Sequence, residues 1–550
     1  MSLRNLFLRS LAHHNKLVKI APCVSAVQNL KYNNYYGDKN EWFNYNRKLA
    51  AALLSAVVIS SVQDDQNSKN ENTVIDAGAK RPDLPTFRAE EVSKHDNKES
   101  FWVIYKYGVY DVTSFLPSHP GGEQIMNAAG YSIEPFWNVY GMHKTQEVYK
   151  LLESYRIGNL HDDDVTDHSD DELWVKEPYR DKRLIVKTVK PFNAEIPPEY
   201  QIAHFDTPNE LFYVRQHMPV PELSEEEHTV TVTIFGDGIS TVNLTLQDIE
   251  RFPQVTVRAA LMCAGNRRSE MNKVKPVKGL SWQAGAISCA TWRGTLLRDV
   301  LLACGLDPRD PRNVDRHIIF TGADIDATGT HFSTSLPLNA ALAADAQVLL
   351  ATHMNGERLP LDHGYPLRVV VPGAPAVRSV KWLQGITIST EESPSHWHQK
   401  DYRSFNPSKT WETADFSTAP PVYSLPVTSA VCQPLDGDTV TADDGHIDIK
   451  GYAYSGGGAK IMRVDVSLDG GASWEEAELV TDPAPPRRHY AWALWSARLR
   501  LPDPKASTVD IWVKATDSNF NTQPENFDHI WNIRGILSNA YNKIKVNIKH

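Results

Sequence analysis

Residues 161–172 form an acidic run, with six aspartates and one glutamate among twelve residues. Such a run cannot bury enough apolar surface to fold, so we expect a solvated hinge. At 550 residues the chain is also too long for one core, since domains hold about 150 residues each. The sequence therefore predicts separate folded modules on the two sides of this run.

Composition and charge narrow the class of protein. The chain is 41% apolar and 23% charged, and after its first tenth it holds no run of eighteen apolar residues, which is typical of a soluble globular protein. The net charge of -10 argues against a nucleic-acid binder and is compatible with a cationic protein partner. Neither a disulfide framework nor a zinc site is expected from five scattered cysteines without a CxxC pair, namely Cys23, Cys263, Cys289, Cys304 and Cys432.

The N-terminal segment has the pattern of a targeting sequence. Its first 37 residues carry five basic side chains and no acid, and the 14 residues from Leu49 to Val62 are largely apolar. A secretory signal would place its apolar core nearer the start, so a mitochondrial presequence is favoured. Because a stable span needs about 20 residues, we expect a sorting signal that leaves the mature protein in the intermembrane space without stable membrane insertion. The alternative is that the apolar stretch remains as an anchor.

Strand patterns divide the remaining chain. Buried sheet in a long α+β stretch is indicated by β-branched runs at residues 230–235, 255–262 and 367–371. An all-β immunoglobulin-like sandwich is predicted from alternating runs at residues 447–454, 462–468 and 509–515. The expected order is a presequence, a polar linker, a first folded module, the acidic hinge, an α+β module and the sandwich, at residues 1–63, 64–82, 83–160, 161–183, 184–421 and 422–550.

Two histidines indicate a metal site in the first folded module. His119 begins the run His-Pro-Gly-Gly, and His143 follows 24 residues later. Two imidazoles on opposite faces of a macrocycle give a six-coordinate iron, which serves one-electron transfer because oxygen cannot bind. Either histidine alone would more often be an ordinary loop or core residue. With the predicted hairpin before it and the amphipathic helix after it, the pair resembles the α+β cytochrome b5 domain, which implies that both are axial ligands of haem b.

A cysteine followed by two arginines is the strongest local signal of the α+β stretch. A strand-like run stops at Cys263, and the sequence continues Ala-Gly-Asn-Arg267-Arg268. A thiolate is a soft ligand for a redox-active transition metal, and guanidiniums can hold an oxyanion. One cysteine is too few for zinc or an iron-sulfur cluster. Alone, these three residues would more often be a buried free cysteine beside surface arginines.

Further motifs change that interpretation. They are Gly279-Leu-Ser-Trp282, the run from Asp362 to Arg368, Val380-Lys381-Trp382 and Trp531-Asn-Ile-Arg534. Together with the cysteine motif they resemble the eukaryotic sulfite oxidase family, from Leu84 to the end of the chain and in the family's domain order. The resemblance implies that sulfite is oxidised to sulfate at a molybdenum-molybdopterin centre and that electrons pass singly through haem b to cytochrome c. It also implies a homodimer formed by the sandwich.

The resemblance implies roles for individual residues. Cys263 would be the protein's sulfur ligand to molybdenum. The cofactor-binding positions are Tyr213, Val214, Arg215, Gln216, His217, Asp324, His363, Arg368, Ser379, Val380 and Lys381. The substrate-pocket positions, whose arginines would bind a dianion, are Arg215, Arg268, Trp282, Tyr402 and Arg534. Gln216 stands where asparagine is expected, with the same amide chemistry.

Two alternatives remain open. A nitrate reductase shares the molybdenum and sandwich domains but carries its b5 module after the sandwich, whereas this chain carries it before. The other is a non-enzymatic haem electron carrier with a degenerate second module, and an intact Cys263 and three pocket arginines argue against it. One molybdenum and one iron per chain would support the enzyme, and iron alone would support the carrier.

Overall fold

The computed structural model describes residues 75–119, 125–126, 128–139, 143–165, 177–236, 238–326, 329–343 and 345–549. The predicted presequence with its apolar stretch, the polar linker up to residue 74 and Cys23 lie outside the described residues. Within the described ranges, no helix is long and apolar enough to cross a membrane.

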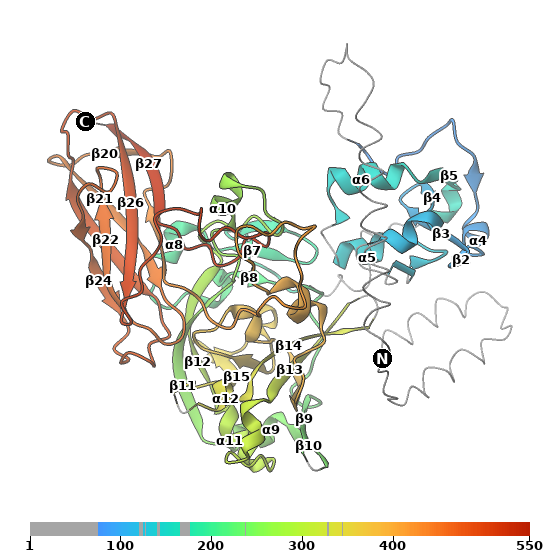
Figure 1. Ribbon diagram of the computed structural model, residues 1–550, viewed down its shortest axis with the longest axis horizontal. Coiled ribbons are helices and arrows are strands. Elements are labelled where there is room, and N and C mark those ends of the chain that lie inside the picture. Colours follow the sequence, from blue (N-terminus) through green and yellow to red (C-terminus); the bar gives the residue numbers. More distant parts are fainter. Residues whose placement is uncertain are drawn as a thin grey trace. The chain divides into compact units, whose positions relative to one another are not determined.

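The module before the acidic run contains a five-stranded sheet with short helices (Figure 1). The strand order is β1 (Thr86–Phe87), β5 (Arg156–Leu160), β4 (Gly108–Asp111), β3 (Ser100–Tyr105) and β2 (Asp96–Asn97). The helices are α4 (Ala89–Val92), η1 (Thr113–Ser118), α5 (Glu134–Val139) and α6 (Gln146–Glu153). The predicted hairpin is β3 and β4, and the predicted helix before the last strand is α6.

The α+β module contains three sheets. The first has the order β10 (Ile239–Thr245), β9 (Thr229–Phe235), β18 (Leu383–Ser389), β13 (His317–Ile325) and β14 (His331–Pro337). The second has the order β11 (Gln254–Met262), β12 (Ile287–Leu296), β15 (Leu349–Met354) and β16 (Glu357–Arg358), with β17 (Arg368–Val370) paired to β15. The small third sheet is β6 (Ile185–Thr188), β7 (Asn193–Glu195) and β8 (Val214–Arg215). The three predicted runs of buried sheet are confirmed as β9, β11 and β17.

Short helices connect these strands. The α-helices are α8 (Pro198–Gln201), α9 (Leu246–Glu250), α10 (Arg268–Val274), α11 (Leu297–Ala303) and α12 (Leu338–Leu342). The 3-10 helices are η4 (Asp162–Asp164), η5 (Asn209–Leu211), η6 (Pro311–Val314), η7 (Leu361–His363) and η8 (Ala376–Arg378), and η9 (Trp397–Asp401) is a π-helical turn.

The C-terminal module consists of two sheets (Figure 1). One apolar core, to which both sheets contribute, lies between them. One sheet has the order β19 (Thr428–Gln433), β21 (His446–Tyr454), β25 (Ala493–Arg500) and β24 (Glu478–Thr481). The other has the order β20 (Thr439–Thr441), β27 (Asn542–Lys549), β26 (Thr508–Asp517), β22 (Ile461–Ser467) and β23 (Glu475–Glu476). The predicted multidomain architecture, with two α+β modules followed by a sandwich, is confirmed.

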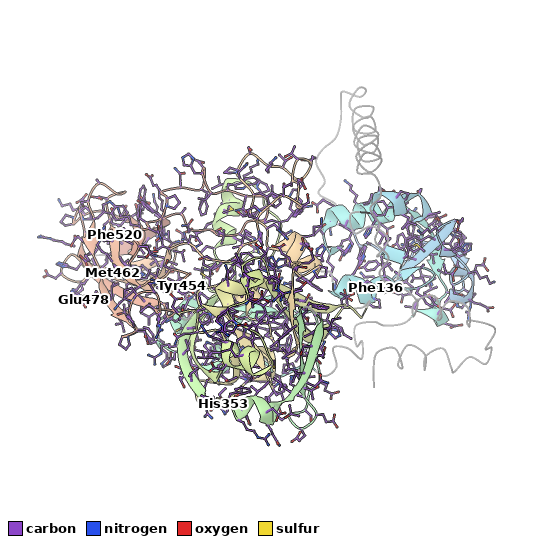
Figure 2. The ribbon with its side chains drawn as sticks, turned by 60° about the horizontal axis from the view of Figure 1, so that its bottom comes forward. Phe136, His353, Tyr454, Met462, Glu478 and Phe520 are labelled. Atoms are coloured by element: carbon purple, nitrogen blue, oxygen red, sulfur yellow. The ribbon has the colours of Figure 1, made fainter. Side chains whose placement is uncertain are left out.

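An apolar cluster joins the sandwich to the α+β module. It contains Met262 and Ile287, which lie at the end of β11 and the start of β12, together with Tyr452 and Tyr454 of β21. Figure 2 shows Tyr454 in this region, whereas Phe520 is labelled on the outer side of the sandwich and is 87% exposed. The sandwich is therefore packed against the second sheet of the α+β module.

The beginning of the acidic run is ordered, although the side chains of Asp162 and Asp163 remain 63% and 75% exposed. Its first three aspartates form the turn η4, and Lys80 pairs with Asp162 at 2.6 Å. Arg88 pairs with Asp164 at 3.0 Å, and the Ala89 backbone N–H donates to the same carboxylate at 2.9 Å. The sequence pattern could not show this because the partner cations lie more than seventy residues earlier. Residues 166–176 lie outside the described residues.

Candidate active site and haem site

The imidazoles of His119 and His143 stand parallel in the first module. Their ring centres are 6.2 Å apart and their planes are 11° from parallel. An iron atom about 2 Å from one nitrogen of each ring requires ring centres about 6 Å apart. At this spacing the two histidines would hold one haem iron between them.

Aromatic side chains support both imidazoles. Trp137 stacks on His143 with 5.4 Å between ring centres, and Phe115 meets His119 edge-on at 5.9 Å. His119 also directly follows the helix η1, to which its backbone N–H remains hydrogen-bonded. The Pro-Gly-Gly residues of the motif lie outside the described residues. The rings are thus held by packing within the module itself.

One cavity of the α+β module collects most of the predicted molybdopterin residues. Those lining it are Tyr213, Arg215, Gln216, His217, Cys263, Asp324, His363, Arg368, Ser379, Val380, Lys381 and Tyr402. They come from β8, the loop after β11, β13, η7, β17 and the segments on both sides of β18. Convergence of polar groups from distant segments on one cavity is the usual form of a cofactor site.

Cys263 lies at the point where β11 ends, on the cavity wall. The residue is 5% exposed, and its Sγ accepts a hydrogen bond from the Gly265 N–H at 3.4 Å. Asn266 fixes the loop, because its amide donates to the Tyr452 hydroxyl at 2.8 Å and accepts from the Ala286 N–H at 3.0 Å. The loop therefore presents one soft sulfur ligand to the cavity.

The two arginines after the cysteine have different surroundings. Arg267 is fully buried with a left-handed backbone at φ 63°, and it donates to Thr428 Oγ1 of the sandwich at 3.2 Å. Arg268 donates instead to the carbonyls of Leu280 at 2.8 Å and Gly535 at 3.0 Å. Arg267 thus ties the cysteine loop to the sandwich, and Arg268 is directed along the edge of the site.

Glycines leave room for the Arg268 side chain. A Cβ would lie within 2.8 Å of its atoms at Gly265, Gly279 and Gly535. Burial lowers the pKa of Arg268 to about 10; Cys263 acts in the opposite direction, and Arg534 and Arg215 add to the lowering. The three predicted pocket arginines therefore lie close enough to influence one another beside Cys263.

Tyr402 follows the turn η9 and lies next to Asp401 in the sequence and His217 in space. Arg534 Nη2 donates to Oδ1 of Asp401, the preceding residue, at 2.7 Å. The Tyr402 hydroxyl lies 3.3 Å from His217 Nε2. Burial raises the pKa of Tyr402 to about 12, so the phenol keeps its proton near neutral pH. It can therefore donate a hydrogen bond to an anion in the cavity.

Asp324 is buried and Lys381 is half-buried, and their side chains carry opposite charges. Burial lowers the pKa of Lys381 to about 7 and raises that of Asp324 to about 7. Asp324 Oδ1 is buried and has no hydrogen-bond partner among the described residues. Such an oxygen is expected to accept from a ligand, and the ring N–H groups of a pterin are donors of that kind. The residues present therefore fit molybdopterin.

Backbone contacts orient Arg368, another cation of the cavity. Arg368 is 4% exposed and donates to the carbonyls of His363 at 2.8 Å and Ser379 at 2.9 Å. Burial lowers the pKa of Arg368 to about 10 and that of His363 to about 4. Near neutral pH, Arg368 is thus charged and His363 neutral, which suits a ligand that combines an anion with a polar ring.

Four predicted site residues, namely Val214, Arg268, Trp282 and Arg534, are not among those that line this cavity. Val214 alternates with Arg215 on β8, so its side chain enters the core while that of Arg215 enters the cavity. Trp282 is fully buried in the core rather than on the cavity wall. Arg268 and Arg534 are likewise absent from the lining and stand beside it.

Sequence reasoning did not predict two polar residues that hold the wall, Asn193 behind it and Asp362 within it. Asn193 Oδ1 accepts from Arg215 Nη1 at 3.1 Å and from the Gln216 N–H at 2.9 Å. Asp362 accepts from Gln216 Nε2 at 2.6 Å and from Arg180. These partners are 22 to 182 residues apart, so no local spacing indicates them. Phe212 and Phe332 also line the cavity without any motif to indicate them, and Trp382 lines it as a member of the Val380-Lys381-Trp382 motif that was not predicted as a site residue.

Three family models match the chain. They are the Cytochrome b5-like Heme/Steroid binding domain at residues 88–161, the Oxidoreductase molybdopterin binding domain at 217–397 and the Mo-co oxidoreductase dimerisation domain at 419–549. The fold, the paired histidines and the cysteine cavity agree with this order. The chain is therefore a molybdopterin oxidoreductase with a b5-like haem domain and a dimerisation domain.

Individual relatives show to which family of molybdopterin oxidoreductases the chain belongs. The mitochondrial sulfite oxidase of Drosophila melanogaster is 50% identical and is matched over 85% of this chain and 82% of the relative. This chain belongs to the sulfite oxidase family. A nitrate reductase [NADH] of Solanum lycopersicum is 35% identical, but the match covers 70% of this chain and 43% of that protein. The crystal structure of the sulfane dehydrogenase SoxCD from Paracoccus pantotrophus shares the fold, with a TM-score of 0.52 at 22% identity over 70% of this chain and 93% of that one.

Proposed function

We propose that this chain oxidises sulfite to sulfate at a molybdenum-molybdopterin centre and passes the electrons singly through haem b. The observation that carries the proposal is the meeting of one soft thiol, Cys263, with the guanidiniums of Arg215 and Arg268 and the protonated phenol of Tyr402. Sulfite is a small dianion with oxygen acceptors, and these groups supply the positive charge and the donor that bind it.

Each residue has a proposed task. Arg215, Arg268 and Arg534 bind and orient the dianion, and their charge favours the sulfate that forms. Tyr402 donates a hydrogen bond to a substrate oxygen, with the neutral His217 beside it. Trp282 packs in the core behind the site. The bound molybdenum supplies the two-electron oxidation and the haem the one-electron relay.

The cofactors have proposed ligands. Cys263 binds molybdenum, and His119 and His143 bind the haem iron. The pterin is held by the cavity residues Tyr213, Arg215, Gln216, His217, Asp324, His363, Arg368, Ser379, Val380 and Lys381, with Val214 contributing through backbone and core packing.

We also propose a compartment within the mitochondrion, an electron acceptor and an oligomeric state for this chain. The Drosophila melanogaster relative is named a mitochondrial sulfite oxidase, and the basic N-terminal pattern agrees with import into the intermembrane space. Cytochrome c is the proposed acceptor, because a net charge of -10 favours a basic partner. The C-terminal domain is proposed to form a homodimer. The proposed boundaries remain residues 83–160 for the haem domain, 184–421 for the catalytic domain and 422–550 for the dimerisation domain.

Metal analysis of the purified full chain tests the proposal. We expect one molybdenum and one iron per chain, together with sulfite-dependent reduction of an added cytochrome c. A nitrate reductase would reduce nitrate and leave sulfite unchanged. A haem carrier would contain iron and no molybdenum.

A further inference from the structure

Arg180 lies in the short segment after the acidic run, and its guanidinium reaches the cavity wall. Its side chain is 10% exposed. It donates from Nε to Asp362 Oδ2 at 2.9 Å and from Nη2 to Asp362 Oδ1 at 2.8 Å. Its Nη2 is also paired with Glu177, and the guanidinium stands 4.2 Å from the centre of the Phe192 ring. A bidentate, mostly buried ion pair of this kind has one well-defined geometry.

Asp362 connects this arginine to two groups of the cofactor pocket. Its carboxylate lines the cavity, and Oδ1 accepts from Gln216 Nε2 at 2.6 Å. Its backbone carbonyl accepts from Lys381 Nζ at 2.9 Å. Asp362 thus touches both the amide and the ammonium that face the pterin, while Arg180 stands outside the lining.

Without Arg180, the negative charge of Asp362 would oppose the binding of an anionic ligand in the pocket. A buried carboxylate without a partner is costly, and it would turn to the nearest available cation or donor. The nearest such group is the Lys381 ammonium, since Gln216 already donates to this carboxylate. Pairing with Asp362 would withdraw the Lys381 charge from an anionic ligand and would leave the carboxylate facing that ligand.

We propose that Arg180 is a positioning residue of the cofactor pocket, which holds Asp362, and with it the Gln216 amide, in place and offsets the carboxylate charge so that Lys381 remains available to the pterin. The proposal rests on the proposed function, because that function assigns the pterin to this cavity. No motif indicates it, since Arg180 and Asp362 are 182 residues apart.

Retention of the cofactor by the purified holoenzyme tests this role. The readout is the ratio of molybdenum and pterin to haem during prolonged dialysis, in which the haem of the separate module is the internal standard. Arg180→Gln should release pterin about ten- to hundredfold faster, the factor for one charged hydrogen bond. Arg183→Gln is the matched control, because Arg183 is 43% exposed and pairs with Asp181 at 2.6 Å on the surface.

Two further variants separate charge from general structure. Arg180→Lys keeps the charge and should retain most of the pterin even if Arg180→Gln folds poorly. Adding Asp362→Asn to Arg180→Gln removes the uncompensated carboxylate and should restore most of the retention. The proposal is overturned if Arg180→Gln keeps its pterin as Arg183→Gln does, or if the double variant releases pterin as fast as Arg180→Gln. Sulfite-dependent haem reduction by the unaltered chain tests the proposed function separately from these ratios.

Discussion

Arg215 Nη1 donates to Asn193 Oδ1 across 3.1 Å, and this bond fixes the pocket arginine to strand β7. Replacing Asn193 by Asp would change a neutral hydrogen bond into an ion pair that cancels the Arg215 charge. We expect KM for sulfite to rise about tenfold with a smaller change in kcat, as for lost ground-state binding. Steady-state kinetics normalised to molybdenum measure this. Asn243→Asp, on an exposed position of β10, is the control, and an equal KM in the two variants would contradict the assignment.

Replacing Cys263 by Ser should abolish sulfite oxidation and leave the haem spectrum unchanged. A hard, poorly ionised hydroxyl then replaces the soft thiol, and the haem ligands belong to a different module. Cys304→Ser is the matched control. Cys304 is also a buried free cysteine, but it packs in a separate apolar core and does not line the cavity. Near-normal turnover by a molybdenum-loaded Cys263→Ser variant would refute the ligand role.

Replacing Arg268 by Gln should lower kcat/KM for sulfite by a loss of roughly 1.5 to 3 kcal/mol, which corresponds to one charged hydrogen bond. Arg309→Gln provides the control, since the Arg309 side chain is 90% exposed. An unchanged kcat/KM in the Arg268 variant would remove this residue from the pocket.

His398 should make the protein less stable in acid. Burial, followed by the neighbouring Arg378, lowers the pKa of this fully buried imidazole to about 3. The unfolded chain takes up the proton below about pH 6.5 and the folded chain does not, so stability falls as pH falls, by about 1.4 kcal/mol per pH unit. In urea unfolding between about pH 6 and 4, His398→Gln should show a slope smaller by up to that amount. Parallel curves for the two proteins would contradict this.

The sequence predicted those parts of the fold that local patterns determine. Alternating and β-branched runs marked β9, β11, β21 and β26, since each strand shows its buried face in its own residues. The paired histidines and the cysteine loop were likewise visible as short motifs. Val214 and Arg215 were both predicted to bind the cofactor, but successive side chains of a strand point to opposite faces. Val214 therefore lies in the core and Arg215 lines the cavity.

Tertiary contacts account for what the sequence could not show. Arg267 and Arg268 are adjacent residues of the same type, but their surroundings differ. Arg267 donates to Thr428 of the sandwich, whereas Arg268 packs against glycines beside the site. Arg180 meets Asp362 only because the chain returns to the same wall after 182 residues. Such contacts form only in the folded chain, so no local spacing in the sequence predicts them.

Anaerobic mixing of the purified holoenzyme with sulfite alone tests the central claim most directly. Electrons taken from sulfite at the Cys263 site should appear in the haem held by His119 and His143, so the haem absorption should change to that of the reduced form without any nicotinamide. The Cys263→Ser variant should keep its haem oxidised under the same conditions. A haem that remains oxidised in the molybdenum-loaded native chain, or one that is reduced equally in the variant, would contradict the account.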